Sequence, residues 1–278
     1  ILQLWKNSRN KKNPLKFILS KILMRLNISH YFIINQNGYR LYFFPTELSR
    51  VLWVDPNESH TATIFFADYL KKNDIIVDIG ANIGTITLQS SIKIGSRGKV
   101  YSIEPNPKIF NFLLKNIQLN KLSNIETFNV ALGDSEGEIN FSDNTSDVVN
   151  LVLSTNEGIK TKITTLDKLI PQDTTIDLLK IDVIGYEKFV LIGSKNILKN
   201  TKCIHFPVIR KQFQNFGYDC QEIFDLLKNN GFELYGFSKE KKIWKINQNY
   251  TSSNEDLLAI RNIEEFIEKT GYFLIDEN

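Results

Sequence analysis

Apolar residues along this chain alternate between the spacing of buried strands and the spacing of amphipathic helices. Short apolar runs predict strands at 75–79, 100–103, 125–130, 176–183, 203–206, 232–237, 242–246 and 256–261. Helical spacing occupies residues 59–72, 107–120, 187–198, 219–229 and 263–269. Because strands alternate with helices, the pattern favours an α/β fold with a mostly parallel sheet, and the late strands predict an antiparallel edge.

The segment before the first buried strand predicts a helix followed by a β-hairpin. Residues 15–28 carry one apolar helical face, made of Leu15, Ile18, Leu19, Ile22 and Leu26. Such a basic amphipathic helix usually packs on its own domain, but weak contact with an anionic membrane surface is the alternative. Apolar runs at 31–34 and 39–44, joined by a polar turn, predict the hairpin, which would cover part of a cleft.

A second hairpin is expected from residues 138–141 and 148–153, before a short helix that Thr165 would cap. The predicted organisation has an N-terminal extension at 1–58, a cofactor-binding domain at 59–261 and a C-terminal helix or tail at 262–278. Insertions at such loops usually set substrate choice. The segments 31–58 and 136–160 are the candidates to face a substrate, but neither carries a diagnostic motif, so the substrate is left open.

The composition is consistent with this fold and limits the classes of protein to which the chain can belong. With 278 residues, 42% of them hydrophobic, the chain can bury one sizeable core. A net charge of +3 gives no strong reason to expect a nucleic-acid partner, and it leaves a local basic patch open. Cys203 and Cys220 make neither a disulfide framework nor a zinc site, which favours a reducing compartment, and the cytoplasm is the expected location. No apolar run reaches the length of about 20 residues that a membrane span needs, and a first residue other than Met is typical of a fragment.

Residues 75–85 carry the strongest chemical signal in the chain. A buried strand containing Asp78 leads into a turn bracketed by Gly80 and Gly84, and then into a helix. Glycines let a ligand approach the main chain, and a helix start offers free N–H groups. The spacing lacks the G-x-G-x-x-G of dinucleotide sites and the Lys-Ser/Thr of a P-loop. An ordinary strand-turn-helix without a ligand is the alternative interpretation.

A second carboxylate supports a nucleoside ligand. Glu104 ends the next strand, 24 residues beyond Gly80. In a doubly wound sheet, an acid at this place binds the ribose hydroxyls of an adenosine-containing ligand. NAD and S-adenosylmethionine (SAM) share that ribose, so Glu104 alone does not separate them. An exposed Glu at a strand end, with no ligand, is the simpler alternative.

Five short motifs in order resemble the FkbM-type family of class I SAM-dependent methyltransferases. They are DIGANIG (78–84), EPNP (104–107), ALGD (131–134), TTLD (164–167) and KIDV (180–183). The resemblance covers roughly residues 40–261 and implies a seven-stranded Rossmann-like sheet, SAM as cofactor and methyl transfer to hydroxyls of sugars or polyketides. It implies cofactor contacts from Asp78, Gly80, Ala81, Asn82, Gly84, Thr85, Glu104, Pro105, Asn129, Val130 and Ala131.

Two departures from the family pattern affect the catalytic residues. Ile184 stands where an acid usually follows the KIDV motif, and Pro207 lies where the fifth strand usually carries one. Proline cannot donate to a strand ladder, so that strand is expected to stop by Phe206. The remaining candidates are Asp182, to orient the acceptor or act as general base, Glu187, to support the first turn of the next helix, and His205, as a base or as a structural residue of its strand. No His, Asp or Glu spacing indicates a metal site.

Three functions therefore stay open at this point. The first is a SAM-dependent O-methyltransferase acting on a saccharide or related small molecule. The second is a SAM-binding pseudoenzyme or regulatory subunit, with catalysis impaired by Ile184 and Pro207. The third, a nucleotide-dependent oxidoreductase, is disfavoured by the missing dinucleotide fingerprint. No sequence feature sets the oligomeric state.

Overall fold

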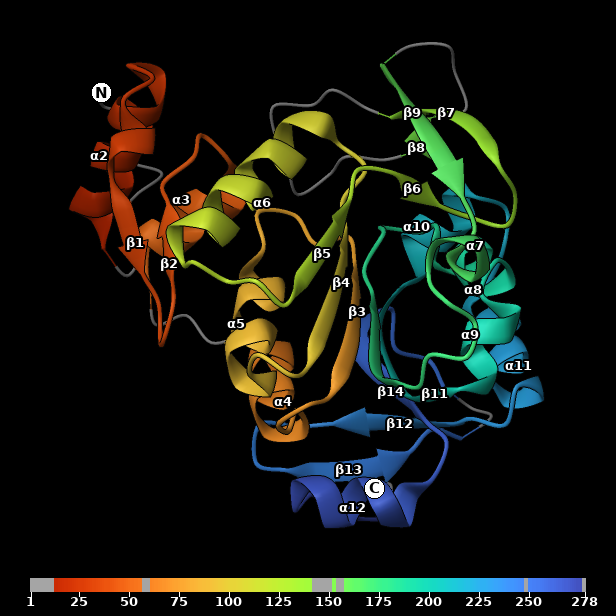
Figure 1. Cartoon of the computed structure of the whole chain (residues 1–278). Helices are drawn as coiled ribbons and strands as arrows, with labels where there is room; N and C mark the ends of the chain where they lie inside the picture. Colours follow the sequence, from red (N-terminus) through yellow and green to blue (C-terminus); the bar gives the residue numbers. More distant parts are fainter. Residues whose placement is uncertain (1–12, 57–60, 142–151, 154–157, 248–249, 277–278) are drawn as a thin grey trace.

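A nine-stranded sheet forms the centre of the molecule (Figure 1). The computed structural model describes residues 13–56, 61–141, 152–153, 158–247 and 250–276. Five parallel strands lie in the spatial order β5 (Ile125–Phe128), β4 (Lys99–Ile103), β3 (Ile75–Ile79), β10 (Ile176–Ile181) and β11 (Thr201–Ile209). β14 (Asn254–Ile260) then runs antiparallel between β11 and β12 (Glu233–Phe237), and β13 (Lys242–Lys245) and β15 (Phe273–Leu274) complete the edge. The predicted mostly parallel α/β sheet with an antiparallel edge is confirmed.

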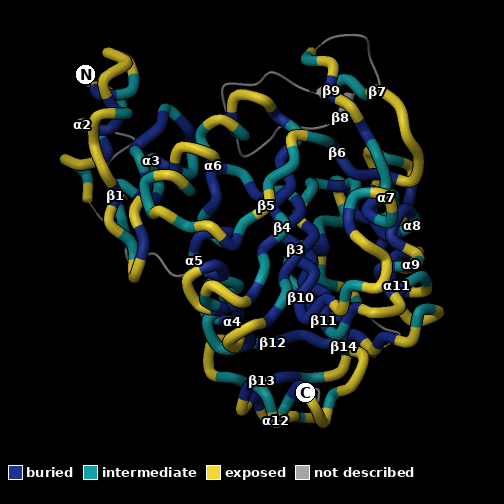
Figure 2. The backbone as a smooth tube through the Cα atoms, viewed as in Figure 1, coloured by how far each residue is buried: buried dark blue, intermediate teal, exposed yellow. Residues whose placement is uncertain are grey.

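Helices cover both faces of this sheet because successive strand residues point to opposite sides. Ile76 and Leu178 pack in one apolar cluster with α4 (Thr61–Tyr69) and α12 (Ile263–Thr270). Val77 and Leu179 face the other cluster, whose helices are α8 (Glu187–Ile192), α9 (Lys195–Lys199) and α11 (Cys220–Asn229). α5 (Thr85–Ile94) follows the glycine turn after β3, as the strand-turn-helix motif predicts, and α6 (Pro107–Leu119) follows β4, as its helical spacing predicts. The strands in the middle of the sheet are dark in Figure 2, which marks them as the buried centre.

The N-terminal extension contains the predicted helix and hairpin, but the helix is turned the other way. It comprises α2 (Pro14–Arg25), a 3-10 turn at Ser29–Tyr31, β1 (Ile33–Asn35), β2 (Arg40–Tyr42) and α3 (Glu47–Val54), of which α3 was not predicted. The buried residues of α2 are Phe17, Ser20 and Leu23. On the predicted inward face, Leu15 is 75% exposed and Leu26 is 61% exposed. The expected packing face of α2 was therefore wrong.

A second, four-stranded sheet lies in the region between β5 and β10 in the sequence. Its order is β6 (Ala131–Leu132), β9 (Ile159–Thr164), β7 (Gly137–Phe141) and β8 (Val152–Leu153). β7 and β8 form the predicted antiparallel hairpin, although residues 148–151 of the expected second strand lie outside the described residues. β9 was not predicted. The helix α7 (Leu166–Leu169) begins after Thr165, whose side chain makes no capping hydrogen bond, contrary to expectation.

Two further expectations about the second half of the sheet were wrong. β11 does not stop at Phe206 but continues through Pro207 to Ile209 and then into α10 (Arg210–Asn215). β10 pairs with β11 only as far as His205, so at Pro207 just one side of the strand needs partners, and β14 supplies them. The predicted helix 187–198 is divided into α8 and α9 at Gly193. A Cβ there would lie 1.9 Å from the carbonyl oxygen of Gly133.

Candidate active site

The turn after β3 is packed directly against the end of β10. Gly80 has a φ of +77°, and a Cβ on it would lie 2.0 Å from the carbonyl oxygen of Asp182. Gly84, with a φ of +95°, is the N-cap residue of α5. This close approach brings the glycine turn and the carboxyl end of β10 to one place, as the sequence motif requires.

A buried lysine, Lys180, contacts β3, the glycine turn and the end of β10. The Lys180 ammonium lies 2.9 Å from Oδ1 of Asp78 and donates a hydrogen bond of 2.9 Å to the carbonyl of Gly80. It also lies 3.8 Å from Oδ2 of Asp182. Burial acts to lower the pKa of Lys180, but the carboxylates of Asp78 and Asp182 outweigh it and hold the pKa above its usual value. Lys180 therefore stays charged and keeps the buried Asp78 compensated.

Glu104 is held at the end of β4 by two main-chain donors. Its Oε2 accepts a hydrogen bond of 2.9 Å from the N–H of Asn82, and its Oε1 accepts one of 2.9 Å from the N–H of Asn106. The side chain of Asn106 in turn caps α6. Burial raises the pKa of the Glu104 carboxyl to about 7. The carboxylate keeps further acceptor lone pairs for a ligand hydroxyl.

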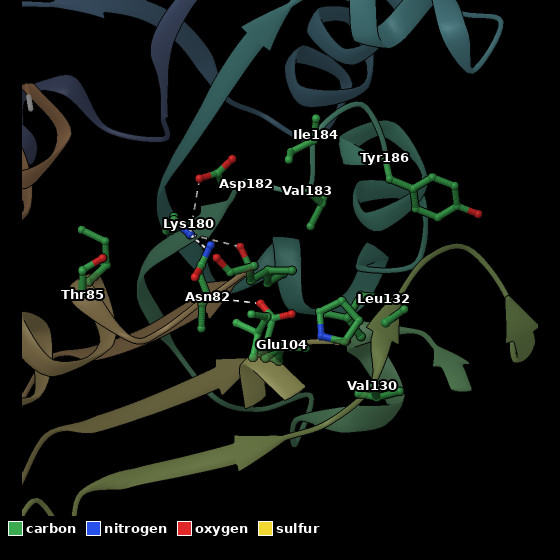
Figure 3. A pocket seen from close by; sticks show the side chains of 18 of the residues that line it. Asn82, Thr85, Glu104, Val130, Leu132, Lys180, Asp182, Val183, Ile184 and Tyr186 are labelled. Carbon is green, nitrogen blue, oxygen red and sulfur yellow. Dashed lines mark hydrogen bonds and ion pairs between the residues drawn. The ribbon is translucent and has the colours of Figure 1, made fainter. Parts of the chain in front are cut away.

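These groups border a cavity of about 450 Å³ at the carboxyl ends of the parallel strands. Of the predicted site residues, those lining it are Gly80, Ala81, Asn82, Thr85, Glu104, Pro105, Val130, Ala131 and Asp182. Figure 3 shows Asn82, Glu104, Lys180 and Asp182 close together, with Ile184 and Tyr186 on the far side. The cavity therefore has a polar wall on β3, β4 and β10 and an apolar wall opposite, which is the usual composition of a small-molecule site.

The other predicted cofactor residues lie just behind this lining. Asp78 is fully buried and also accepts a hydrogen bond from the Thr87 hydroxyl. Asn129 donates from Nδ2 to the carbonyl oxygens of Glu104 and Pro105, at 2.8 and 3.1 Å, and so fixes the main chain that carries the acid. Neither side chain is part of the cavity surface.

Glu187 and His205 were catalytic candidates, and neither lines the cavity. Glu187 is fully buried, and its two oxygens accept hydrogen bonds from the N–H groups of Val183 and Gly185. It thereby holds the turn that carries Ile184 at a φ of +50°. The His205 ring lies 5.0 Å from the ring of Phe66 and has Nε2 3.6 Å from Asp256. In this geometry Glu187 supports the turn beside the cavity, and His205 packs in the core.

The pH dependence of stability should reveal the buried Glu187. Burial raises the pKa of its carboxyl from 4.5 to about 7. The folded state thus binds more protons than the unfolded state between these values, so stability falls as the pH rises from about 5 to 8. We expect Glu187 to contribute a loss of roughly 3 kcal/mol in the free energy of unfolding over this range. Urea unfolding at several pH values should show a flatter profile for Glu187→Gln, and an unchanged profile would contradict the assignment.

Several residues of the site were not found from the sequence. Beyond Lys180, the cavity is lined by Leu48, Ile86, Ile109, Tyr186, Ile209 and Gln212. Lys180 pairs in register with Asp78 on the neighbouring parallel strand. The sequence signal that could have identified Lys180 is its place in the KIDV motif, two residues before Asp182. Leu48 comes from α3, so the N-terminal extension does reach the cavity. Within the described part of the chain, no group of three or more His, Cys, Asp or Glu side chains could hold a metal.

The FkbM methyltransferase domain model matches residues 78–234, which is more than half of the chain. The chain belongs to the FkbM methyltransferase domain family. The match begins at Asp78 and runs through the glycine turn, Glu104 and Asp182 into β12, so this FkbM domain includes most of the cavity. The suspected family is thus shown.

Curated relatives match this chain over short segments. A tRNA(Phe) (4-demethylwyosine(37)-C(7)) aminocarboxypropyltransferase of Methanocaldococcus jannaschii is 32% identical over 82 residues, 30% of this chain and 32% of the relative. A probable cobalt-precorrin-6B C(15)-methyltransferase (decarboxylating) of Saccharolobus solfataricus is 37% identical over 49 residues, 18% of this chain and 25% of the relative. The matched segments thus span a third or less of these relatives' lengths.

Solved structures are similar at a low level. The crystal structure of M. jannaschii TYW2 in complex with AdoMet has a TM-score of 0.43 and 18% identity, and covers 82% of this chain and 84% of that chain. The crystal structure of Aeropyrum pernix fibrillarin with bound S-adenosyl-L-methionine has a TM-score of 0.42 and 15% identity, and covers 72% of this chain and 73% of that chain. At these scores neither structure bears on the activity of this chain. Among the described residues, no helix is long and apolar enough to cross a membrane.

Proposed function

We propose that this FkbM domain binds SAM in the cavity and transfers its methyl group to a hydroxyl of a saccharide or related small molecule. The observation that carries the proposal is Glu104, a buried carboxylate held at the cavity wall by the N–H groups of Asn82 and Asn106. Its position at the end of the strand beside the glycine turn is the one from which an acid binds an adenosine ribose.

The residues around Glu104 fit the rest of such a ligand. The glycine turn at Gly80 leaves the main chain open to the methionine part, and Val130 and Ala131 offer an apolar edge for the adenine. Asp182 and Lys180 line the same cavity. Bound SAM would supply a methyl group on a sulfonium, which is already an excellent leaving group.

The protein then has to orient the acceptor and take its proton. In the proposed reaction, the acceptor oxygen forms a bond to the methyl carbon while the carbon–sulfur bond breaks, and the sulfur keeps the electron pair. The acceptor proton goes to the carboxylate of Asp182, whose side chain is 49% exposed and lines the cavity. Lys180 lies 3.8 Å from that carboxylate and orients it.

A SAM-binding relative with impaired catalysis is the second candidate, and Ile184 supports it. This side chain lines the cavity where the family resemblance expects an acid, so it can neither accept a proton nor orient a hydroxyl. The two candidates share cofactor binding and differ in turnover. Binding and methyl transfer therefore have to be measured separately.

Removing the Glu104 carboxylate should weaken cofactor binding. We expect Glu104→Ala to reduce SAM affinity by about 1–3 kcal/mol, the scale of hydrogen bonds to a charged group. Isothermal titration calorimetry measures this, with Glu126→Ala as the matched control, because Glu126 is a half-exposed acid on β5 that pairs with Lys99. Folded wild-type protein that binds NADH in place of SAM, or binds neither, would refute the proposed cofactor.

A further inference from the structure

The outward face of α2 is an aliphatic stripe that the rest of the described chain leaves exposed. Leu15, Leu19, Ile22 and Leu26 follow one another at helical spacings of four, three and four residues, which places them on one side of the helix. Leu19 and Ile22 are each 45% exposed, and the other two are more exposed. The opposite side carries Phe17 and is buried against the rest of the extension. Figure 2 shows the exposed stretches of α2 at the outer border of the molecule.

More exposed apolar residues follow directly in the chain. Ile28, Tyr31, Phe32 and Ile33 are between 37% and 76% exposed. One apolar side chain in water is ordinary, whereas a run of them on one short extension marks a contact surface. A helix that satisfies its own main-chain hydrogen bonds can enter an apolar medium without further partners.

The charge of this region is strongly one-sided. Residues 1–46 contain eight Lys and Arg and no Asp or Glu, whereas residues 47–278 contain 26 Lys and Arg against 31 Asp and Glu. On α2 itself, the spacing of 100° per residue puts Lys16 on one flank of the stripe and Arg25 on the other, whereas Lys21 lies toward the buried side, with its ammonium 5.1 Å from the centre of the Phe17 ring. Basic side chains on both flanks of an apolar stripe are the pattern of a helix that lies in an anionic membrane interface.

We infer that α2 docks this protein on anionic lipid bilayers, with the Leu15–Leu26 stripe inserted between headgroups and Lys16 and Arg25 on lipid phosphates. Two terms act together in this contact. Burial of the aliphatic side chains gives the attraction that salt does not screen, and the basic residues give the preference for anionic lipid. The extension is well placed to connect this surface with the cavity, because α3 packs on α2 and contributes Leu48 to the lining.

Co-sedimentation of the full chain with vesicles tests the inference without any assay of methyl transfer. The probes are vesicles of phosphatidylglycerol and phosphatidylcholine in equal parts, and vesicles of phosphatidylcholine alone. We expect the wild type to pellet with the anionic vesicles and to stay largely in solution with the neutral ones. Raising the salt from about 0.1 M to about 1 M should weaken binding, since the screening length falls from about 10 Å to about 3 Å.

Matched variants separate the stripe from general hydrophobicity and charge. Leu19→Ser with Ile22→Ser should reduce partitioning at least about tenfold, because both side chains would leave the apolar phase. The control pair is Phe273→Ser with Leu274→Ser, at 49% and 54% exposure on the far edge strand β15. Lys16→Glu with Arg25→Glu should weaken anionic binding about fivefold or more at each position. Lys199→Glu with Lys228→Glu, on α9 and α11, is its control.

The outcomes divide cleanly. Circular dichroism melting of each variant first establishes that the fold is retained, which is expected because all the changed residues lie on the surface. Wild-type protein that stays in solution with anionic vesicles overturns the inference. The stripe would then be covered by something other than lipid, such as a second copy of the chain. Equal pelleting of wild type and stripe variants also overturns the inference, as does a dimer that dissociates on Leu19→Ser with Ile22→Ser.

Discussion

Replacing Gly80 by alanine should destabilise this protein more than a glycine-to-alanine substitution at any other turn of the site. The new Cβ would lie 2.0 Å from the carbonyl oxygen of Asp182, which is main chain and has no side-chain torsion to relieve the contact. The φ of +77° adds the cost of a left-handed conformation for an L-residue, about 1–2 kcal/mol. Together with the overpacking, we expect the free energy of unfolding to fall by roughly 3–5 kcal/mol.

Gly38→Ala provides the matched control for this change. Gly38 has a φ of +94°, in the same left-handed range, but no atom lies within 4 Å of its Cβ position. This variant should therefore lose only the conformational part, about 1–2 kcal/mol. Urea unfolding followed by circular dichroism compares the two. Equal losses for both variants would show that the turn after β3 can move away from β10, and that the cavity wall is not built on this contact.

The residues that could be predicted from the sequence are those whose signal is local. The buried strand with Asp78, the two glycines that follow it and Glu104 at the next strand end lie within one β-α-β unit. Their spacing alone places them at the same edge of a parallel sheet. The structure puts Gly80 and Glu104 on the cavity wall.

What could not be predicted depends on segments that are distant in the sequence. Lys180 faces Asp78 only because β10 pairs with β3, and nothing near Lys180 in the sequence shows that register. Pro207 stays in a strand because β10 has already ended and β14, which comes much later in the chain, supplies the pairing.

The error on α2 has another origin, because this helix has apolar residues on two sides. Periodicity detects the wide stripe through Leu15 and Ile22, and it passes over the narrower set of Phe17 and Leu23. Burial of α2 is decided by what the rest of the extension offers. Phe17 is covered by the guanidinium of Arg50 at 4.8 Å, and Leu23 joins the apolar cluster of the hairpin. The hydrophobic pattern of a helix thus shows which apolar residues share a side, but it does not show whether that side packs on the protein or contacts a membrane.

Asp182 should be the residue on which methyl transfer depends most. Among the described residues, Asp182 is the acid lining the cavity that is neither fully buried nor held by main-chain donors, so a bound acceptor can reach it. Asp182→Asn keeps the shape and the reach of the side chain but cannot accept a proton. If Asp182 is the general base, we expect turnover to fall by about 10²- to 10⁴-fold, with SAM affinity retained.

The experiment is radiolabelled methyl transfer across a panel of hydroxyl-bearing saccharides, with SAM affinity measured for each variant. Asp225→Asn is the control, because Asp225 is an exposed acid on α11 outside the cavity. If Ile184 limits the reaction, Ile184→Glu should raise turnover and Ile184→Gln, of similar shape without the charge, should not. Asp182→Asn added to Ile184→Glu should lower it again. Strong wild-type turnover that survives Asp182→Asn and ignores Ile184→Glu would mean that another group takes the acceptor's proton.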